Sequence, residues 1–367
     1  MNVLVVNAGS SSLKLRVLDG SDDLLAAHDL APDDPLPADL PPVDAVGHRI
    51  VHGGPEFRAP VVVTDAVTAR LQALVDLAPL HQPKSLRALS AVSAQLPGVP
   101  HVACFDTAFH ATLPAEASTY PLPAAWRERY GVRRYGFHGL SHAYAARRAG
   151  ELLGRPVEGL RLVTCHLGAG ASLAAVHSGR SVDTTMGFTP LEGLVMATRS
   201  GSIDPGLLLW LQEHEALPER EVAEALEHRS GLLALAGTAD MREILARDDE
   251  EARLALAVYQ HRLRAGIAAM TAALGGLDAL VVTGGVGENS AEVRAGAAAG
   301  LGWLGVRVEA AANAGLTGDG DVSAAGAAVR TLVVHSREDL EIARQVRRTL
   351  TAPPRCSGSR SDVGGGV

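Results

Sequence analysis

Cysteine is scarce in this chain. Only three cysteines occur among its 367 residues, at Cys104, Cys165 and Cys356, and no two of them form a C-x-x-C pair. Two of the three lie inside apolar runs. A sparse, odd-numbered set of this kind predicts buried thiols in a reducing compartment.

An excess of positive charge and long apolar runs are also lacking. The net charge of −8 and the pI of about 6.0 argue against a nucleic-acid-binding surface, which needs a basic patch. The longest apolar region, residues 265–287, is interrupted by Gly275, Gly276 and Asp278, so it predicts a helix followed by a strand and no membrane span. Met1 leads directly into a strand pattern, so we expect no signal peptide. Together these features predict a cytoplasmic protein.

Two common nucleotide-binding motifs are missing. No G-x-x-x-x-G-K-[ST] sequence occurs, which excludes a P-loop enzyme. GAGASL at 168–173 begins like a dinucleotide fingerprint, but it lacks the third glycine and leads into a strand where that motif needs a helix. GVGENS at 285–290 fails at the same third position. A nicotinamide dehydrogenase is therefore not expected.

Glycine, in contrast, is abundant. The 39 glycines cluster beside apolar runs, a distribution that predicts many tight turns between strands and helices. Hydrophobic residues at 47% and charged residues at 20% are typical of a globular protein. The length of 367 residues favours two domains, each able to bury its own core.

The chain opens on a stretch that combines a strand with a polar turn, MNVLVVNAGSSSLK. Residues 3–6 have the composition of a strand buried on both faces. The strand runs into Asn7 and Gly9, and three serines and Lys14 follow. Gly9 permits backbone conformations that allow a sharp turn, and the hydroxyls and the lysine suit phosphate oxygens and a metal. The alternative for this stretch alone is an ordinary serine-rich hairpin turn.

The same design occurs again near residue 160. An apolar strand at 162–165, a glycine turn at 166–170 and a second strand at 171–176 follow one another. A third glycine turn follows the strand at 280–283 and precedes a helix that we expect to begin near Asn289 or Ser290. Corresponding hairpins in two halves predict an α/β fold of duplicated ribonuclease H-like domains with nucleotide in the cleft between them. This is the layout of the actin, sugar kinase and heat-shock chaperone superfamily.

Two further groups of polar residues follow predicted strands. A strand at 99–105 leads into Asp106 and His110, and carboxylates at such strand ends bind ligands in open α/β sheets. The alternative is that Asp106 caps the next turn. His138 and His142 lie four residues apart, as metal ligands on one helical face do. No Cys, Asp or Glu accompanies them and glycines favour a turn there, so we expect a structural role for His142.

The rest of the chain gives a coarse pattern of elements. We expect helices at 64–77, 85–95, 142–153, 250–274 and 336–350, a mostly helical region at 207–264, and strands at 307–309 and 331–335. The proline-rich residues 31–42 predict a surface loop, and residues 114–135 are expected to be irregular. Residues 183–206 also have little periodicity, and loops of that length are usually functional.

From Asn7 to about Leu340 the chain resembles the acetate kinase family. The motifs that carry the resemblance are, in order, NAGSSSLK, HRIVHGG, APLH, FDTAFH, YGFHGLSH, CHLGAG, DTTMGFTPLEGL, TRSGSIDP, ADMR and GGVGENS. The resemblance implies reversible transfer of the γ-phosphoryl group of ATP to acetate, giving acetyl phosphate and ADP. It further implies a requirement for Mg²⁺, with Mn²⁺ as a substitute, and a homodimer.

The resemblance also implies roles for individual residues. The catalytic residues would be Asp106, His138 and Arg199, and the metal would be held by Asn7 and Glu338. Arg49 would bind the substrate carboxylate, beside an acyl pocket formed by Val51, Leu80, Phe137 and Pro190. The nucleotide and its phosphates would be bound by Ser10, Ser12, Lys14, His166, Leu167, Gly168, Ala169, Gly170, Asp240, Met241, Arg242, Gly285, Val286, Gly287, Glu288 and Asn289.

The sequence departs from the family pattern at two places. Ala169 stands where the family usually has an asparagine, which removes one expected nucleotide contact. The segment VVHSREDL replaces a PTNEEL-like segment, so that Asp339 is an alternative to Glu338 as metal ligand. The implied domains are 1–108 with about 338–352, and 109–337, followed by a disordered tail at 353–367.

These residue types suit phosphoryl transfer to a carboxylate. Acetate is already ionised at neutral pH, so no general base is needed, and the main obstacle is repulsion between two anions. Two arginines, a histidine and Mg²⁺ counter that repulsion. We expect direct in-line transfer, with Asp106 positioning Mg²⁺ through water, and a preference for acetate over propionate and butyrate because Val51 narrows the pocket.

Two other functions remain open. The first is a kinase for another short-chain carboxylate such as propionate, which would share every catalytic residue. The second is an ATP-driven binding module like the actin and chaperone relatives. Such a module would have no use for Arg49, His138 and Arg199 together.

Overall fold

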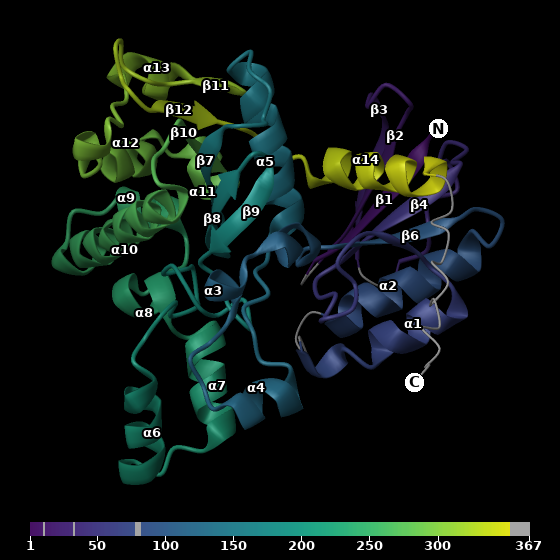
Figure 1. Cartoon of the computed structure of the whole chain (residues 1–367), viewed down its shortest axis with the longest axis horizontal. Helices are drawn as coiled ribbons and strands as arrows, with labels where there is room; N and C mark the ends of the chain where they lie inside the picture. Colours follow the sequence, from purple (N-terminus) through teal and green to yellow (C-terminus); the bar gives the residue numbers. More distant parts are fainter. Residues whose placement is uncertain (10–11, 32–33, 78–81, 353–367) are drawn as a thin grey trace, which may run out of the picture.

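The structure is a computed structural model that describes residues 1–9, 12–31, 34–77 and 82–352. Within these residues the chain forms two six-stranded mixed sheets with helices packed against them (Figure 1). The predicted site residues Ser10 and Leu80, Cys356 and the predicted tail at 353–367 lie outside the described residues.

The first sheet has the strand order β3-β2-β1-β4-β6-β5. Its strands are β1 (Val3–Ala8), β2 (Leu13–Leu18), β3 (Leu24–Leu30), β4 (Ala45–Ile50), β5 (Val61–Val62) and β6 (His101–Phe105). β1, β2 and β3 form an antiparallel meander, β4 and β6 run parallel to β1, and β5 is an antiparallel edge strand. The carboxyl ends of β1, β4 and β6 therefore meet at one edge of the sheet.

The second sheet repeats this design in the order β9-β8-β7-β10-β12-β11. Its strands are β7 (Arg161–Leu167), β8 (Ala171–His177), β9 (Arg180–Thr184), β10 (Ala279–Thr283), β11 (Gly320–Asp321) and β12 (Arg330–Val333). β7 to β9 form the meander, β10 is parallel to β7 and β12, and β11 is the antiparallel edge. The prediction of a duplicated α/β fold is confirmed.

Fourteen α-helices and three short 3₁₀ helices occur in the described residues. The α-helices are α1 (Asp65–Gln72), α2 (Gln82–Gln95), α3 (Ala115–Ser118), α4 (Ala124–Tyr130), α5 (Gly139–Leu152), α6 (Pro205–His214), α7 (Glu219–His228), α8 (Gly231–Ala236), α9 (Met241–Leu245), α10 (Glu250–Leu274), α11 (Gly285–Asn289), α12 (Ala291–Ala299), α13 (Ala310–Gly315) and α14 (Glu338–Thr351). The 3₁₀ helices are η1 (Val75–Leu77), η2 (Ala108–Thr112) and η3 (Gly302–Leu304). None of the described helices combines the length and apolar character needed to cross a membrane.

The two halves differ in how the third strand of the meander connects to the fourth strand. In the second half, residues 185–278 between β9 and β10 hold the five helices α6 to α10. In the first half, the described residues between β3 and β4 form no helix or strand, as the proline-rich sequence predicts. Leu36, Leu40 and Val43 of this loop pack against the core beneath it. The first half therefore covers this sheet face with α2 and a loop.

α14 comes last in the chain but packs against the first sheet (Figure 1). Ile342, Ala343 and Val346 are fully buried and share a core with Val3 and Val5 of β1. The approach to β4 is close, because a Cβ added at Gly47 would lie 2.5 Å from Cγ2 of Ile342. Glu338 at the start of α14 is thereby brought to the edge of the first sheet.

The structure corrects four predictions of local structure. α3 and α4 occupy residues that we expected to be irregular; each follows a proline at its N-cap, where a missing N–H costs no helical hydrogen bond. α5 begins at Gly139, three residues before the predicted start. Ser290 is the N-cap of α12 as expected, but the short helix α11 precedes it. Residues 307–309 form only isolated bridges, through Val306 and Val308.

Candidate active site

Three predicted site residues come from the carboxyl ends of three parallel strands. Asn7 lies near the end of β1, Arg49 near the end of β4, and Asp106 directly follows β6. A backbone hydrogen bond from Asp106 N to Ile50 O, 3.0 Å long, extends the pairing of β6 with β4. The parallel register thus places an amide, a guanidinium and a carboxylate at one edge of the sheet.

Arg49 connects these groups. Its Nη2 donates to Asp106 Oδ2 at 2.6 Å and its Nη1 donates to Asn7 Oδ1 at 3.2 Å. Burial tends to lower the pKa of Arg49, but the carboxylates of Asp106 and Glu338 outweigh it and raise the pKa above its ordinary value. Burial raises the pKa of Asp106, whose side chain is 1% exposed. Arg49 lowers this pKa, but the net shift is upward. The pair is a buried ion pair at the base of the site.

Glu338 completes this group from the other end of the chain. Its Oε2 accepts a 3.2 Å hydrogen bond from Asn7 Nδ2 and lies 3.7 Å from Arg49 Nε. Asp339, the alternative metal ligand, forms an ion pair with Arg337 at 2.9 Å instead. Of the two neighbouring carboxylates, Glu338 is the one in contact with Asn7 and Arg49.

The donor set around Asn7 fits Mg²⁺ better than a transition metal. Within the described residues, no group of three or more His, Cys, Asp or Glu side chains is placed to hold a metal ion. Asn7, Asp106 and Glu338 offer amide and carboxylate oxygens. Mg²⁺ usually keeps several waters and binds one or two carboxylates together with substrate phosphates, so a sparse oxygen set suffices.

His138 is held in a constrained position beside this group. It adopts a left-handed backbone conformation, with a φ of 54°, as the N-cap of α5. The next residue, Gly139, donates its N–H to Asp106 O at 2.9 Å, and a Cβ at Gly139 would lie only 2.1 Å from that oxygen. The start of α5 can therefore approach β6 only because residue 139 is glycine. The His138 ring stacks on His166 with centroids 4.3 Å apart.

Arg199 extends from the long loop between β9 and α6. Its Nη1 donates to Pro190 O at 3.2 Å, and its Nε lies 3.1 Å from Glu227 Oε2 on α7. A Cβ added at Gly170 would lie 3.3 Å from Nε2 of His138 and 3.5 Å from Nη1 of Arg199. The glycine turn after β7, His138 and Arg199 therefore meet at one point.

The residues predicted to form the acyl pocket are partly brought together. Val51 and Phe137 are buried, at 7% and 1% exposure, and belong to one apolar cluster. Pro190 O accepts a hydrogen bond from Arg199, which places Pro190 beside that arginine. Leu80 lies outside the described residues. Burial of Val51 beside Phe137 is equally consistent with core packing, so the pocket role stays a prediction.

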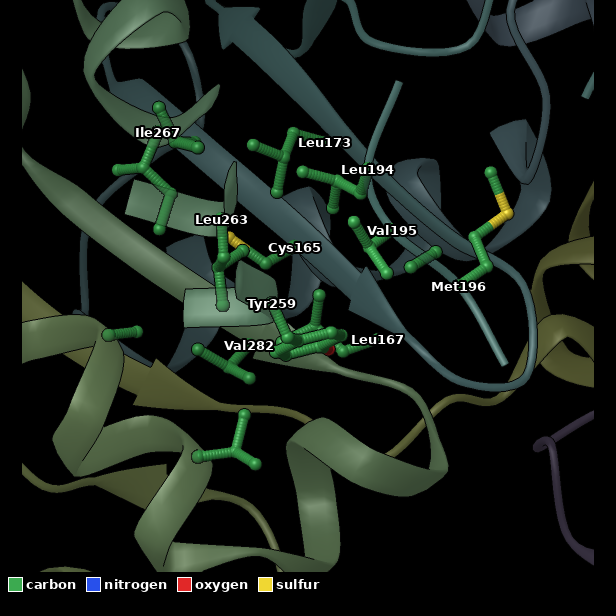
Figure 2. Close-up of a cluster of buried hydrophobic side chains, with 14 of the residues drawn as sticks. Cys165, Leu167, Leu173, Leu194, Val195, Met196, Tyr259, Leu263, Ile267 and Val282 are labelled. Atoms are coloured by element: carbon green, nitrogen blue, oxygen red, sulfur yellow. The ribbon is translucent and has the colours of Figure 1, made fainter. Parts of the chain in front are cut away.

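The predicted nucleotide residues divide into exposed and buried ones. Leu167 and Met241, at 2% and 5% exposure, point into the apolar core, where Figure 2 shows Leu167 near Tyr259 and Val282. Only their backbone atoms are available to a ligand. An added Cβ at Gly285 would meet no atom within 4 Å, so the backbone there is open to approach, and Ala169 is exposed.

Several predicted nucleotide residues have contacts within the chain. Glu288 Oε1 accepts from Gly284 N at 2.7 Å and from Ser336 N at 2.8 Å, which ties the turn after β10 to the segment before α14. Asp240 is the N-cap of α9, and hydrogen bonding from Arg242 lowers the pKa of Asp240 to about 2. The remaining predicted members are Val286 and Gly287 in α11 and Asn289, whose Nδ2 donates to Gly285 O at 2.8 Å.

The opening hairpin is closed by a hydrogen bond from Gly9 N to Ser12 O, 2.8 Å long. The chain turns at Gly9 as expected, although Gly9 is not among the described glycines with positive φ. Glycine is favoured there by space, because a Cβ would lie 3.3 Å from Ser12 O. Lys14 is exposed and lies directly opposite Asn7 in the β1–β2 register, on the same face of the sheet.

Several residues that hold the site in place are not predicted from the sequence. Glu227 holds Arg199, Ser141 Oγ lies 2.8 Å from His166 Nδ1, and Ser172 Oγ lies 2.9 Å from His138 Nδ1. The long loop is held by Glu192, which pairs with Arg134 at 2.6 Å and accepts from Tyr120 Oη at 2.5 Å. Ser172 is recognisable in the sequence, because it is a polar residue within an apolar strand. His142 is fully buried among hydrogen bonds, as the predicted structural role requires.

Comparisons with known proteins assign the chain to a family. The family model described as the Acetokinase family matches residues 32–344. An acetate kinase of Gloeobacter violaceus is 51% identical over 313 residues, which are 84% of this chain and 77% of that protein.

Solved structures give the same result. The crystal structure of Porphyromonas gingivalis acetate kinase has a TM-score of 0.87 and 36% identity, covering 95% of this chain and 99% of that one. A propionate kinase from Francisella tularensis has a TM-score of 0.86 and 30% identity, with the same coverage. The chain therefore belongs to the acetokinase family and is a kinase that transfers phosphoryl groups to carboxylates.

Proposed function

We propose that this enzyme catalyses the reversible, Mg²⁺-dependent transfer of the γ-phosphoryl group of ATP to acetate. One observation carries the proposal: a single hydrogen bond joins the two groups of charged residues. Gly139 N donates to Asp106 O, and Asp106 forms the ion pair with Arg49. The residue before Gly139 is His138, which meets Arg199 beside Gly170. Two guanidinium groups, those of Arg49 and Arg199, thus lie near the imidazole of His138 beside a glycine-rich turn. Donors so arranged oppose the repulsion between a carboxylate and a phosphoryl group.

The roles of the residues follow from their charges. Arg49 binds the acetate carboxylate, which is already ionised at neutral pH and needs no general base. Arg199, fixed by Glu227 and by Pro190 O, and His138 stabilise the charge on the transferring phosphoryl group. The backbone of the turns after β7 and β10 holds the nucleotide phosphates. Transfer is direct and in line, and a phosphorylated Asp106 or Glu338 trapped during turnover would contradict it.

The metal belongs at the edge of the first sheet. Asn7 and Glu338 would hold Mg²⁺, or Mn²⁺ in its place, with Asp106 contacting it through water. When bound, the metal neutralises charge on the phosphates. The hydrogen bond from Asn7 Nδ2 to Glu338 Oε2 already holds these two side chains side by side before any ligand binds.

An Asn7→Ala variant should need a higher Mg²⁺ concentration for half-maximal activity, by about tenfold, because one oxygen ligand is lost and Glu338 loses its hydrogen bond. The measurement is initial rate against Mg²⁺ at saturating ATP and acetate. Asn2→Ala is the matched control, since Asn2 precedes the other end of β1 and its amide donates to Pro42 O, away from the site. An Asn7→Ala protein with normal Mg²⁺ dependence would contradict the assignment.

Trapping acetyl phosphate as the hydroxamate tests the whole proposal. With ATP, Mg²⁺ and hydroxylamine we expect kcat/KM to fall from acetate to propionate to butyrate, because Val51 and Phe137 leave little space for a longer chain. One methylene changes the transition-state free energy by about 1–3 kcal/mol, so propionate should still react. Equal kcat/KM for acetate and butyrate would refute the pocket assignment. Preference for propionate would support the alternative of a propionate kinase.

The same assay distinguishes an enzyme from an ATP-driven binding module. A module of the actin or chaperone kind would hydrolyse ATP without forming any hydroxamate. The ion pair of Arg49 and the anchored Arg199 argue against such a module, which has no carboxylate substrate to bind.

We also propose that the enzyme is a homodimer and that α6 lies in the interface. No residue of α6 is buried, although the helix carries Leu207, Leu209 and Trp210 at 46%, 59% and 46% exposure. Exposed apolar side chains gathered on one helix mark protein–protein interaction sites. A single monomeric species in sedimentation at micromolar concentration would contradict the dimer.

The domain division that we propose is 1–108 with 338–352, and 109–337. The burial of Ile342 and Val346 against the first sheet supports the return of the C-terminal helix. The buried free thiols of Cys104 and Cys165 support a cytoplasmic location.

A further inference from the structure

A row of buried hydrogen bonds extends from His138 into the second sheet. His138 Nδ1 lies 2.9 Å from Ser172 Oγ, the same oxygen lies 2.8 Å from His142 Nε2, and His142 Nδ1 lies 2.8 Å from Thr164 Oγ1. Ser172, His142 and Thr164 are each completely buried. These four side chains therefore form one continuous row of hydrogen bonds. His138 is the N-cap of α5, His142 lies on α5, Thr164 lies on β7 and Ser172 lies on β8.

The number of protons on these four side chains limits the directions in which their hydrogen bonds can run. Burial lowers the pKa of His142 well below its ordinary value, with His110 and His166 adding to the effect, so the ring is neutral and carries one N–H. Each hydroxyl also carries one proton. If His142 changes its tautomer, the hydroxyls of Thr164 and Ser172 must both point the other way. Ser172 Oγ could also accept from both rings, but its own proton would then have no acceptor among the described residues; with the Ser172 proton used, two orders of these hydrogen bonds remain.

In the first order, the donors point away from the active site. Thr164 donates to Ala174 O at 3.4 Å, His142 Nδ1–H donates to Thr164, and Ser172 donates to His142 Nε2. His138 must then carry its proton on Nδ1 and donate to Ser172. Its Nε2 is left with a bare lone pair.

In the second order, every donor points toward the active site. Thr164 donates to His142 Nδ1, His142 Nε2–H donates to Ser172, and Ser172 donates to His138 Nδ1. His138 then carries its proton on Nε2. The only hydrogen bond given up is the one from Thr164 to Ala174 O, which at 3.4 Å is long and weak.

The Nε2 edge of His138 faces the point where the phosphoryl group is expected. A Cβ at Gly170 would lie 3.3 Å from Nε2 of His138, and Nη1 of Arg199 lies beside the same position. Burial and the neighbouring His166, His142, Arg49 and Arg199 all lower the pKa of His138, so its ring is neutral as well. A neutral ring can donate to a phosphoryl oxygen only from Nε2–H; in the first order it would present a lone pair to an anion.

We propose that Ser172, His142 and Thr164 are positioning residues that fix His138 as the Nε2–H tautomer, so that a neutral histidine donates a hydrogen bond to the phosphoryl group. The proposal deepens the proposed function and rests on it. It explains how a buried imidazole stabilises a negative charge without first taking up a proton. Ser172 is the essential connection, since its single hydroxyl joins the two rings.

The tautomer of His138 is directly measurable. In full-length enzyme with ¹⁵N-labelled histidine and bound acetyl phosphate, two-bond ¹H–¹⁵N correlations distinguish Nε2–H from Nδ1–H. No ADP is added, so no turnover occurs. We expect the Nε2–H form for both His138 and His142. The Nδ1–H form of His138 in the complex would overturn the proposal.

Ser172→Ala should release His138 from this constraint. We expect a mixture of His138 tautomers and a loss of about tenfold or more in kcat, with KM for acetate within about twofold of wild type. We also expect kcat of the variant to rise toward acidic pH, because a protonated ring donates from Nε2 whatever its former tautomer. An unchanged tautomer and pH profile in Ser172→Ala would overturn the proposal.

Ser181→Ala is the matched control. Ser181 is equally buried and its Oγ lies 2.8 Å from a ring nitrogen of another histidine, His110. This variant should lose similar stability but keep the His138 tautomer and the pH profile. If both serine variants shift the pH profile alike, the effect is structural and the proposal fails.

Variants at His142 provide a second test should Ser172→Ala fail to fold. The side-chain amide of His142→Gln can still donate to Ser172 and should keep kcat within a fewfold of wild type, whereas His142→Leu should not. Equal kcat in the two variants would overturn the proposal. Absence of any hydroxamate from wild-type enzyme would refute the proposed function itself, whereas the NMR result reports on the hydrogen-bond chain alone.

Discussion

Replacing Arg199 by alanine is expected to lower kcat by about 10²- to 10³-fold, the loss found when one preorganised donor to a developing charge is removed. The KM for acetate should change little, because the carboxylate is bound by Arg49. Arg199 is well placed for such a role: Glu227 Oε2 at 3.1 Å and Pro190 O at 3.2 Å fix the guanidinium before substrate arrives. The hydroxamate assay with varied acetate separates kcat from KM.

Two control variants distinguish charge from geometry. Arg199→Lys keeps the charge but cannot contact Glu227 and Pro190 O together, so it should recover only part of the activity. Glu227→Gln keeps the arginine and removes its charged anchor, and should lose less activity than Arg199→Ala. An Arg199→Ala enzyme with kcat within tenfold of wild type would show that Arg199 does not stabilise the transition state.

Arg49→Ala is expected to affect both activity and stability. Loss of the carboxylate-binding guanidinium should raise the KM for acetate at least tenfold. In addition, Asp106 would remain in place, 1% exposed, without its 2.6 Å partner. Breaking a buried ion pair from one side costs about 3–5 kcal/mol of unfolding free energy. Denaturant unfolding measures the second effect.

The pH dependence of this loss has a definite sign. Burial already raises the pKa of Asp106, and Arg49 opposes that rise, so removing Arg49 raises the pKa further. A folded carboxyl with a raised pKa binds more protons than the unfolded one, so its contribution to stability falls as the pH rises through the folded pKa. Arg49→Ala should therefore be destabilised less at pH 5 than at pH 8. The double variant Arg49→Ala, Asp106→Asn should regain stability at pH 8; a double variant no more stable than Arg49→Ala would contradict this account.

The sequence predicts best those features that depend on local chemistry. β-branched runs that end in glycine turns correctly predicted the hairpins of both sheets, and Thr64 and Ser290 are N-caps as expected. The duplication was also predicted, and both sheets have the same strand order. The residues of the site were predicted from motifs, and the structure brings Asn7, Arg49, Asp106 and Glu338 into contact.

The remaining features depend on contacts between distant segments. Glu227 is one of several glutamates on an amphipathic helix, and only the folded loop shows that it holds Arg199. The glycine at position 139 favours a turn by its sequence, but in the structure it begins α5 and allows the helix to approach Asp106 O closely. Leu167 and Met241 lie within nucleotide motifs, yet their side chains fill the core, because neighbouring residues on one element face in different directions.

The return of α14 to the first sheet has a consequence for biosynthesis. Val3, Val5 and Ala45 leave the ribosome well before the side chains that cover them, Ile342, Ala343 and Val346, because these lie far later in the chain. One apolar face of the first sheet therefore stays uncovered while nearly the whole of the second half is translated. During that interval the nascent chain depends on chaperones or on provisional contacts to avoid aggregation. Folding of the first half is completed only after α14 has been synthesised, and α14 brings with it Glu338 of the candidate active site.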